Sequence, residues 1–342
     1  MEKLVEIKDL AVSYFTYAGE VQAVRGISFD IANGKTTALV GESGCGKSVT
    51  SKALLGLIEK PGVVKEGSQI LWDGKNILDF TAKEWNAFRG GECSMIFQDA
   101  LVSLNPTMKI GKQIIENLAN HNRKSLPKSQ LRQKAVEMLD MVGIPDPEAC
   151  LNKYPHELSG GMRQRVMIAT AMITHPRLLI ADEPTTALDV TIQAQILELM
   201  KTLQKKLGMA IIMITHDLGV VADMCDDIVV MYAGKIVEKG SSEDIFYHPH
   251  HPYTWALMNA VPRLDLDNKE ELVTIEGTIP DMIHPPRGCA FCSRCPYAME
   301  VCAEHQPPVT ALGGGHETAC WLTDPRADVS DIPFLTGGAD HV

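Results

Sequence analysis

Short apolar runs alternate with segments of helical periodicity up to about residue 245. Ile27, Phe29 and Ile31 alternate with polar residues, a pattern that predicts a half-buried strand. Further strands are predicted at the apolar runs Thr36–Val40, Leu178–Ala181, Met209–Thr215 and Ile228–Tyr232. A helix that ends near Gly208 is predicted by the one-sided spacing of Ile192, Ile196, Leu199 and Leu203. Strands that alternate with helices favour an α/β fold with a mainly parallel sheet.

The pattern changes twice along the chain. Between about residues 99 and 176 the strand signal is missing, and helical periodicity at Ile110–Ala119 and Leu131–Val142 predicts a helical insertion in the α/β core. After about residue 246 the chain becomes rich in proline, histidine and then cysteine. We therefore expect a first domain over 1–245 and a C-terminal domain over 246–342, whose last twenty residues fray.

Composition narrows the class of protein. The chain has 342 residues, of which 45% are hydrophobic and 22% charged, as is usual for a folded protein. The net charge of −11 disfavours nucleic acid as a bulk partner, because phosphate backbones bind basic surfaces. No apolar run is long enough to span a bilayer, and the N-terminus lacks the apolar core of a signal peptide. We expect the chain to stay in the cytoplasm.

A glycine-rich motif follows the strand predicted at Thr36–Val40. Residues 41–48 fit G-x-x-x-x-G-K-[ST] and precede a helix-compatible run, which is the context that a phosphate-binding loop requires. In such a loop backbone N–H groups surround the phosphates, Lys47 reaches the β- and γ-phosphates, and the Ser48 hydroxyl binds Mg²⁺. The bland alternative is a glycine turn with an exposed lysine. The candidate nucleotide contacts here are Gly41, Ser43, Gly44, Cys45, Gly46, Lys47, Ser48 and Val49.

Polar residues stand at the ends of three other predicted strands. Asp182 and Glu183 follow a buried run, where Asp182 suits the Mg²⁺ shell and Glu183 could polarise the water that attacks the γ-phosphate. His216 ends the run Met209–Thr215 and could touch the γ-phosphate or that water. Gln98 follows a short apolar run and could contact Mg²⁺ or water. Each of these residues, taken alone, could be an ordinary strand end.

A second anion site is predicted at Ser159-Gly160-Gly161. Ser159 is a good N-cap, and the glycines expose backbone N–H groups at the start of a predicted helix, Met162–Ile173. The chain already has one phosphate loop. A second helix end that binds anions makes sense if it serves the nucleotide of another subunit.

Taken in order, these elements resemble the nucleotide-binding cassette of ABC transporters across roughly residues 4–245. The resemblance implies a P-loop core, an antiparallel β subdomain and the helical insertion. It implies that two cassettes close head to tail around two ATP molecules, with Ser159, Gly160 and Gly161 on the partner's γ-phosphate. Asp189 would line the dimer interface, and Tyr14 would stack on adenine. Gln98, at the start of the insertion, could couple the γ-phosphate to a membrane partner.

Five of the nine cysteines crowd into Cys289–Cys320, which suggests a metal or cluster in a reducing compartment. Local spacing gives C-x₂-C-x₂-C followed by Pro296, similar to bacterial ferredoxin loops. Zinc on four thiolates and free thiols are the alternatives. His248, His250 and His251 could indicate a further metal site, but the prolines around them favour a docking loop.

The same stretch resembles the C-terminal region of dipeptide/oligopeptide transporter ATPases. The matching residues are Gly288-Cys289, Phe291, Arg294-Cys295-Pro296, Cys302, Pro307, Ala319-Cys320-Trp321 and His251–Thr254. This resemblance implies a [4Fe–4S] cluster at about 285–322, on Cys289, Cys295, Cys302 and Cys320, with zinc as runner-up. Cys292 departs from the family pattern. Because the phosphate loop is far away in sequence, we expect ATP binding to persist when these cysteines are replaced.

The two resemblances together imply an ATPase that powers import of dipeptides or oligopeptides. The implied partners are a second, non-identical ATPase subunit, two transmembrane permease subunits and an extracytoplasmic peptide-binding protein. The implied location is the cytoplasmic face of the membrane. Import of nickel or another small solute is the alternative, and a soluble ABC ATPase that acts on nucleic acid or ribosomes is the rival from another class. The sequence does not identify the solute or the role of the cluster.

Overall fold

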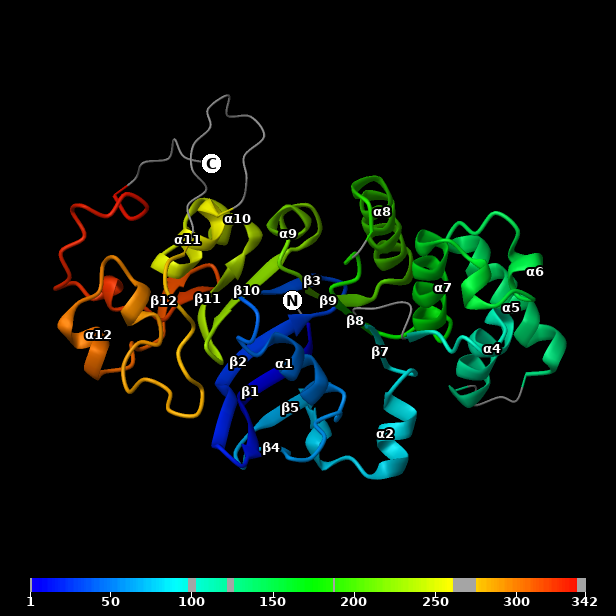
Figure 1. Cartoon of the computed structure of the whole chain (residues 1–342), viewed down its shortest axis with the longest axis horizontal. Coiled ribbons are helices and arrows are strands. Elements are labelled where there is room, and N and C mark those ends of the chain that lie inside the picture. The colour runs from blue at the N-terminus through cyan, green and yellow to red at the C-terminus, as the bar shows by residue number, and fades with distance from the viewer. Residues whose placement is uncertain (1, 98–102, 122–125, 187, 261–274, 337–342) are drawn as a thin grey trace. The chain divides into compact units, whose positions relative to one another are not determined.

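The computed structural model describes residues 2–97, 103–121, 126–186, 188–260 and 275–336. Two compact units share the chain, and each contains separate stretches of sequence. Figure 1 labels the elements and colours the chain by residue number. Unit 1 consists of Met1–Leu4, Ile31–Thr36 and Asp79–Thr215. Unit 2 consists of Val5–Asp30, Thr37–Leu78 and His216–Val342.

Unit 2 holds most of an antiparallel sheet of order β2-β1-β5-β6, in which β4 also pairs with β1. Its strands are β1 Lys3–Thr16, β2 Gly19–Ala32, β4 Gly62–Val64, β5 Gln69–Trp72 and β6 Lys75–Asn76. On β2 the apolar Ile27, Phe29 and Ile31 are buried while the polar residues between them are exposed. The predicted half-buried strand is confirmed, because a pleated strand points alternate side chains to opposite faces.

A second run of strands in unit 2 is mixed, with the order β12-β13-β11-β10-β3. Its strands are β3 Thr36–Val40, β10 Asp227–Tyr232, β11 Lys235–Ser241, β12 Thr310–Gly313 and β13 His316–Thr318. Only the β10–β3 pairing in this run is parallel. The predicted strands β3 and β10 pair in parallel, as expected, and the sheet is mixed because the hairpin to β11 and the C-terminal strands add antiparallel pairs.

The C-terminal strands join the rest of unit 2 through β11. Glu238 and Lys239 of β11 lie opposite Thr318 and Glu317 of β13. Strands from both sides of the expected boundary at 245/246 therefore share hydrogen bonds, and that boundary stays a prediction. The helices of unit 2 are α1 Lys47–Leu54, α9 Leu218–Met224, α10 Ser242–Tyr247, α11 Pro252–Asn259 and α12 Glu300–Glu304. Short 3-10 turns lie at Ile77–Asp79, Cys292–Arg294 and Trp321–Thr323. The turn Ile77–Asp79 passes from unit 2 into unit 1.

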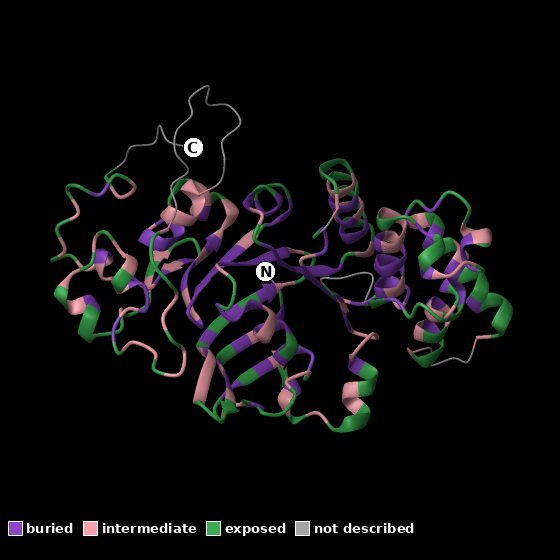
Figure 2. Cartoon of the chain, in the orientation of Figure 1, coloured by how far each residue is buried: buried purple, intermediate pink, exposed green. Residues whose placement is uncertain are grey.

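Unit 1 holds three parallel strands of order β9-β8-β7, namely β7 Cys93–Ile96, β8 Leu178–Asp182 and β9 Ala210–Ile214. All residues of β8 and β9 are buried, as their continuous apolar runs predict (Figure 2). Helix α8 Val190–Leu207 ends at Gly208, whose φ of 65° is left-handed, as predicted for a glycine stop.

The helical insertion is confirmed: the described part of 103–176 contains helices and no strand. The helices of unit 1 are α2 Ala82–Phe88, α4 Ile110–His121, α5 Lys128–Met141, α6 Pro147–Cys150, α7 Gly160–Met172 and α8, with a 3-10 turn at Pro155–Glu157. Helices α4, α5 and α7 contact one another. Among the described helices, none is long and apolar enough to cross a membrane.

The C-terminal tail packs further than its composition predicts. Ile332 is buried with Cys320 and Leu322, and Phe334 is one of the partly buried side chains on this cluster. The ring of Phe334 also stacks on Trp255 of α11. The expectation that the last twenty residues fray is therefore wrong for this part of the tail, because apolar side chains spaced along the turns of 329–335 find a common core. Residues 337–342 lie outside the described part.

Candidate ATP site and cysteine site

The phosphate loop of unit 2 connects β3 to α1 and depends on its glycines. Gly41, Gly44 and Gly46 have φ angles of 143°, 80° and 107°, a range that L side chains rarely adopt. A Cβ at Gly41 would lie 2.1 Å from the Met231 carbonyl oxygen, so this backbone needs glycine for close packing. At Gly44 a Cβ would meet nothing within 4 Å, which leaves that side of the loop open.

Lys47 holds the loop from inside. Its side chain is buried, and its Nζ donates to the carbonyl oxygens of Gly41 at 2.7 Å and Glu42 at 3.0 Å. The buried Cys45 lies beside it, 3.6 Å from Nζ, and burial raises the pKa of the Cys45 thiol. A buried ammonium that faces loop carbonyls, above the start of α1, is a suitable cation for phosphate oxygens.

Two other predicted contacts belong to unit 2. Tyr14 is half-buried on β1 opposite Gly62 of β4, where a Cβ would lie 2.7 Å from the tyrosine ring. His216 is exposed and precedes α9, whose N-terminus is capped by the Asp217 carboxylate through Gly219 N–H at 2.9 Å and Val220 N–H at 3.3 Å.

The two acidic residues stand at the end of β8 in unit 1. Asp182 is the last residue of the strand and is buried. Glu183 has a left-handed φ of 48°, a backbone conformation that costs a glutamate roughly 1–3 kcal/mol. Its N–H donates to the Ile214 carbonyl at 2.8 Å, and its carboxylate accepts the Thr186 hydroxyl at 3.0 Å. These bonds hold the strained residue in place.

The predicted anion-binding helix end also lies in unit 1. The Ser159 hydroxyl accepts the Met162 N–H at 3.3 Å, so the predicted N-cap is confirmed. A Cβ at Gly161 would lie 3.0 Å from the side chain of Ile192, near the start of α8, and a Cβ at Gly160 would lie 4.0 Å from Leu188. Asp189 caps α8 through the Ile192 N–H at 3.0 Å.

The start of α7 is connected to the loop that carries Glu183. The Gln164 side-chain amide on α7 donates to the carbonyl of Pro184, and Gln164 is buried. Unit 1 therefore brings together Ser159, Asp189 and the acidic pair, whereas Lys47, Tyr14 and His216 belong to unit 2. Gln98 lies outside the described residues.

Comparison with known proteins assigns the family. The chain matches the ABC transporter family over residues 24–186 and the family "Oligopeptide/dipeptide transporter, C-terminal region" over residues 237–302. It is 54% identical over 332 residues to the oligopeptide transport ATP-binding protein OppD of Bacillus subtilis (strain 168), covering 97% of this chain and 92% of that protein. Identity to the dipeptide transport ATP-binding protein DppD of Lactococcus lactis subsp. cremoris (strain MG1363) is 52% over 326 residues, with 95% and 93% covered.

This chain belongs to the ATP-binding subunits of peptide ABC transporters. The resemblance predicted from the sequence is confirmed, and the chain is an ABC-type ATPase for which ATP with Mg²⁺ is expected. A dimeric post-hydrolysis structure of the ATP-binding cassette MJ0796 with ADP and Pi is similar, with a TM-score of 0.62 and 26% identity over 70% of this chain and 98% of that one. The fold is that of an ABC ATPase.

The ATP-binding subunit carries its five clustered cysteines without a disulfide. Gly288 directly precedes the first of them, and a Cβ at this position would lie 2.1 Å from the Cys302 carbonyl oxygen. The Cys289 N–H donates to that same oxygen at 2.7 Å. Burial raises the pKa of the Cys320 thiol to about 12, and the thiols of Cys289, Cys295 and Cys302 add to this shift. The thiol of Cys292 likewise acts on Cys289 and Cys295, so these neighbours do not separate the four cysteines that the family resemblance implies from the fifth.

None of the five clustered cysteines belongs to a compact group of possible metal ligands among the described residues. Among the described residues, Glu238, His250 and His316 form the one group of three or more His, Cys, Asp or Glu with ligand atoms all within 4.8 Å. Tetrahedral zinc with bonds of about 2.3 Å places its sulfurs about 3.8 Å apart. A four-iron cluster binds each thiolate at a separate corner, which requires a wider set of sulfurs.

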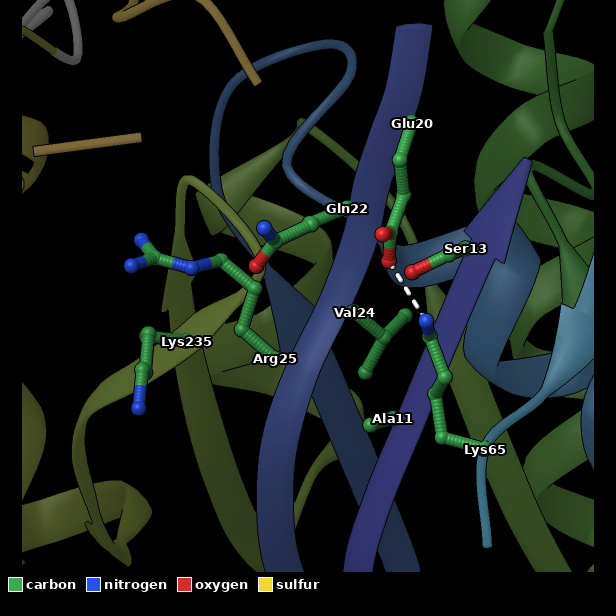
Figure 3. A pocket seen from close by; sticks show the side chains of 8 residues that line it. All are labelled: Ala11, Ser13, Glu20, Gln22, Val24, Arg25, Lys65 and Lys235. Carbon is green, nitrogen blue, oxygen red and sulfur yellow. Dashed lines mark ion pairs between the residues drawn. The ribbon is translucent and has the colours of Figure 1, made fainter. Parts of the chain in front are cut away.

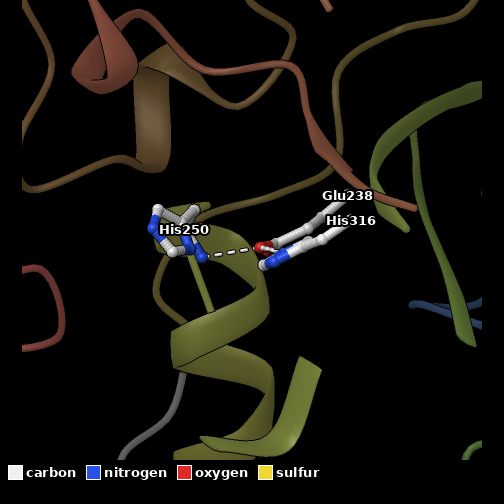
Figure 4. Close-up of side chains that lie close together, drawn as sticks. All are labelled: Glu238, His250 and His316. Atoms are coloured by element: carbon white, nitrogen blue, oxygen red, sulfur yellow. Dashed lines mark hydrogen bonds and ion pairs between the residues drawn. The ribbon is translucent and has the colours of Figure 1, made fainter. Parts of the chain in front are cut away.

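The Glu238 group has a structural explanation (Figure 4). Glu238 is fully buried, and its carboxylate accepts the backbone N–H groups of His250 at 2.6 Å and His251 at 3.0 Å, with a ring nitrogen of His316 at 2.8 Å. Both oxygens are thus already satisfied by hydrogen bonds, as a buried carboxylate requires. The group anchors the histidine segment and β13 on β11, whereas the docking role favoured from the sequence stays a prediction.

A pocket of about 360 Å³ in unit 2 has Val24 in its lining, whose side chain would lie 3.3 Å from a Cβ at Gly46 of the phosphate loop (Figure 3). Glu20 and Lys65 form an ion pair of 2.6 Å on one side of it, and Arg25 and Lys235 line it as well. Burial lowers the pKa of Lys235, and the nearby Arg25 adds to the shift. None of the residues predicted to bind nucleotide lines this pocket.

Sequence reasoning missed the partner of Glu42. This residue of the phosphate loop forms an ion pair with Arg294, which lies between Cys292 and Cys295. The signal was a carboxylate inside a loop that binds anions, since such a charge calls for a nearby cation.

Proposed function

We propose that this ATPase powers the import of peptides through two membrane subunits. The supporting observation is similarity over 97% of the chain to a protein named as an oligopeptide transport ATP-binding protein, including the C-terminal region at 237–302. The net charge of −11 fits this proposal better than a role on nucleic acid.

In this proposal the predicted residues have different roles in the ATP chemistry. Lys47 and the loop N–H groups bind the β- and γ-phosphates, and Tyr14 stacks on adenine. Asp182 and Ser48 hold Mg²⁺, with Gln98 as a further contact to the metal or water. Glu183 orients the attacking water, and His216 contacts the γ-phosphate. The remaining loop contacts are Gly41, Ser43, Gly44, Cys45, Gly46 and Val49.

A second cassette completes each site. Ser159, Gly160 and Gly161 bind the γ-phosphate held by the partner cassette, and Asp189 lines the interface. The partner ATPase is non-identical, and two permease subunits and an extracytoplasmic peptide-binding protein complete the transporter. The chain acts at the cytoplasmic face of the membrane, with a cassette over 1–245 and a C-terminal domain over 246–342.

We further propose a [4Fe–4S] cluster on Cys289, Cys295, Cys302 and Cys320. Thiols that form no disulfide are a suitable donor set, and the match of residues 237–302 to the C-terminal region of oligopeptide/dipeptide transporters supports the proposal. A bound cluster would supply iron–thiolate bonds that join Cys289 and Cys295, on either side of the 3-10 turn, to α12 and to the segment after β13. Zinc remains the alternative metal.

Ser159→Arg is expected to lower the ATPase turnover of the assembled transporter roughly a hundredfold, because a bulky cation at the start of α7 blocks the partner's γ-phosphate. Nucleotide affinity of the separate subunit should stay unchanged, since Lys47 is untouched. Turnover and equilibrium ATP binding measure the two effects.

Ser159→Ala is the matched control for the lost N-cap. It removes the hydroxyl that accepts Met162 N–H, at a cost of about 1 kcal/mol in stability, but leaves the helix end open to phosphate. If Ser159→Arg abolishes ATP binding to the separate subunit as fully as Lys47→Ala does, the shared site between two cassettes is wrong.

Isolation of the native complex tests the proposed function. We expect the chain to copurify from membranes with two polytopic proteins and a second ATPase, and the associated binding protein to carry a peptide. A binding protein that carries nickel would change the assigned solute from a peptide to nickel. Copurification with ribosomes or nucleic acid, without polytopic proteins, would reject the transporter.

A further inference from the structure

An arginine of the cysteine-rich segment reaches the phosphate loop within unit 2. Arg294 ends the 3-10 turn Cys292–Arg294, and its side chain is only 3% exposed. Its guanidinium pairs with the Glu42 carboxylate in two parallel bonds, Nη1 to Oε2 at 2.6 Å and Nη2 to Oε1 at 3.0 Å. This bidentate geometry is the strongest form of arginine–carboxylate pairing.

Every donor of this guanidinium has an acceptor. Besides the two bonds to Glu42, Nη1 donates to the Tyr232 hydroxyl at 3.2 Å, Nη2 to the Ile275 carbonyl at 2.9 Å and Nε to the Glu276 carbonyl at 2.8 Å. Arginine has five N–H donors in a fixed planar arrangement, so these contacts define one position for the side chain. Lysine has fewer donors and no planar geometry, and could not reproduce them.

Glu42 is fixed at three points. Its carboxylate pairs with Arg294, and its backbone N–H donates to the Tyr253 hydroxyl at 2.8 Å. Its carbonyl oxygen accepts the Lys47 ammonium at 3.0 Å. Tyr253 is fully buried and packs on the ring of Phe291, also in the cysteine-rich segment, with ring centroids 5.3 Å apart. The shape of the phosphate loop therefore depends on contacts from the C-terminal region.

The charge of Glu42 gives Arg294 a second effect. The Glu42 side chain is 28% exposed, and it lies in a loop that is meant to receive a polyanion. An unpaired carboxylate there would repel nucleotide phosphates, because like charges at close range disfavour each other. The paired guanidinium cancels that charge and keeps the carboxylate turned toward the C-terminal region.

We propose that Arg294 is a positioning residue for ATP: by pairing with Glu42 it holds the phosphate loop in the shape that accepts nucleotide and neutralises the loop's carboxylate. The inference rests on the proposed assignment of residues 41–48 as the ATP site. In this proposal the cysteine-rich segment supports the ATP site. It affects the affinity for nucleotide and not the rate of the chemical step.

Arg294→Ala in the full-length chain tests the proposal. We expect the Kd for ATP and the KM of the assembled transporter to rise about tenfold, the scale of a lost charge-assisted pair, with kcat unchanged within about twofold. Arg294→Lys should give a smaller rise in Kd. Arg326→Ala is the matched control, because Arg326 pairs with Asp324 in the same C-terminal region but is 87% exposed, and its Kd should equal that of the wild type.

A double-mutant cycle with Glu42→Gln isolates the pair. Without the carboxylate charge, the further change Arg294→Ala should alter the Kd by less than about twofold. A purely structural role would lower the fraction of chains that bind ATP and leave the Kd of the rest unchanged, and that result would overturn the proposal. So would equal effects of Arg294→Ala in both backgrounds.

The failure of the site assignment gives a different result. Lys47→Ala should abolish ATP binding if residues 41–48 form the site. Wild-type affinity in Lys47→Ala would reject the site and, with it, the proposal. Loss of binding in Lys47→Ala together with wild-type affinity in Arg294→Ala would keep the site and reject the positioning role.

Discussion

Glu183→Gln is expected to retain ATP binding and to lower steady-state hydrolysis by a hundredfold or more, about the range for loss of a group that assists proton transfer. The amide cannot accept the proton of the attacking water, whereas the phosphate loop around Lys47 is unchanged. The strained backbone at residue 183 should be preserved, since its bonds to Ile214 and Thr186 involve backbone atoms and a side-chain oxygen that glutamine also has. Phosphate release and ATP affinity of the assembled transporter measure the two effects.

Glu198→Gln is the control for this substitution. Glu198 is exposed on α8 in the same unit, so removal of its charge should leave turnover unchanged. The glutamine variant at position 183 should also accumulate as an ATP-bound closed pair of cassettes, visible as a larger species in size-exclusion chromatography. Near-wild-type hydrolysis in Glu183→Gln would contradict the role assigned to this carboxylate.

Local chemistry explains which parts of the site could be predicted from the sequence. The phosphate loop needs glycine at positions 41, 44 and 46 because the φ angle is positive at each of them. This requirement leaves a recognisable motif between β3 and α1. The cap at Ser159 and the stop at Gly208 are likewise satisfied within a few residues. Continuous apolar runs predicted β8 and β9, since strands buried on both faces have no polar positions.

Contacts between distant parts of the sequence left no such pattern. Arg294 and Glu42 are 252 residues apart, so although a carboxylate in an anion-binding loop calls for a cation, nothing near Glu42 in the sequence identifies Arg294 as that cation. The fully buried Glu238 stands in a strand of mixed character, and its partner His316 is 78 residues away. The antiparallel addition of β13 to β11 depends on a hairpin of only a few residues per strand, too short for a periodic signal.

One expectation from the sequence rests on a reason that the structure contradicts. ATP binding was expected to persist in cysteine variants because the phosphate loop is far away along the chain. Arg294 immediately precedes Cys295 and contacts Glu42 of that loop, so distance in sequence does not separate the two sites. The ATP affinity of cysteine variants should therefore be measured together with their metal content.

The second large effect is expected at the cysteine site. Protein purified without oxygen should be brown and contain about four iron and four sulfide per chain, as a cubane on four cysteines requires. The buried cluster of Cys320, Leu322 and Ile332 supplies some apolar packing, but it is small for a segment of this length. Iron–thiolate bonds would supply the rest of the stability. Iron and acid-labile sulfide assays, with the visible absorption spectrum, give the measurement.

The ligand assignment follows from which substitutions remove the iron. Cys295→Ser, Cys302→Ser and Cys320→Ser should each reduce iron from about four to below about one per chain, because a cubane needs its four thiolates. Cys292→Ser is the matched control in the same turn as Arg294 and should keep its iron. If the purified protein contains stoichiometric zinc and no iron, the site is a zinc site and the cluster assignment is wrong.

The pattern of losses also separates the two ways of choosing four ligands from five cysteines. Ferredoxin-like spacing uses Cys289, Cys292 and Cys295 and would tolerate Cys320→Ser. The family resemblance implies the other set, in which Cys320, buried against Leu322, is a ligand and Cys292 is not. Iron loss in Cys292→Ser with retention in Cys320→Ser would therefore overturn the set assigned here, even if the cluster itself is present. The opposite pattern would keep Cys320 in the ligand set, and the cluster would then join the segment after β13 to Cys295, which directly follows Arg294.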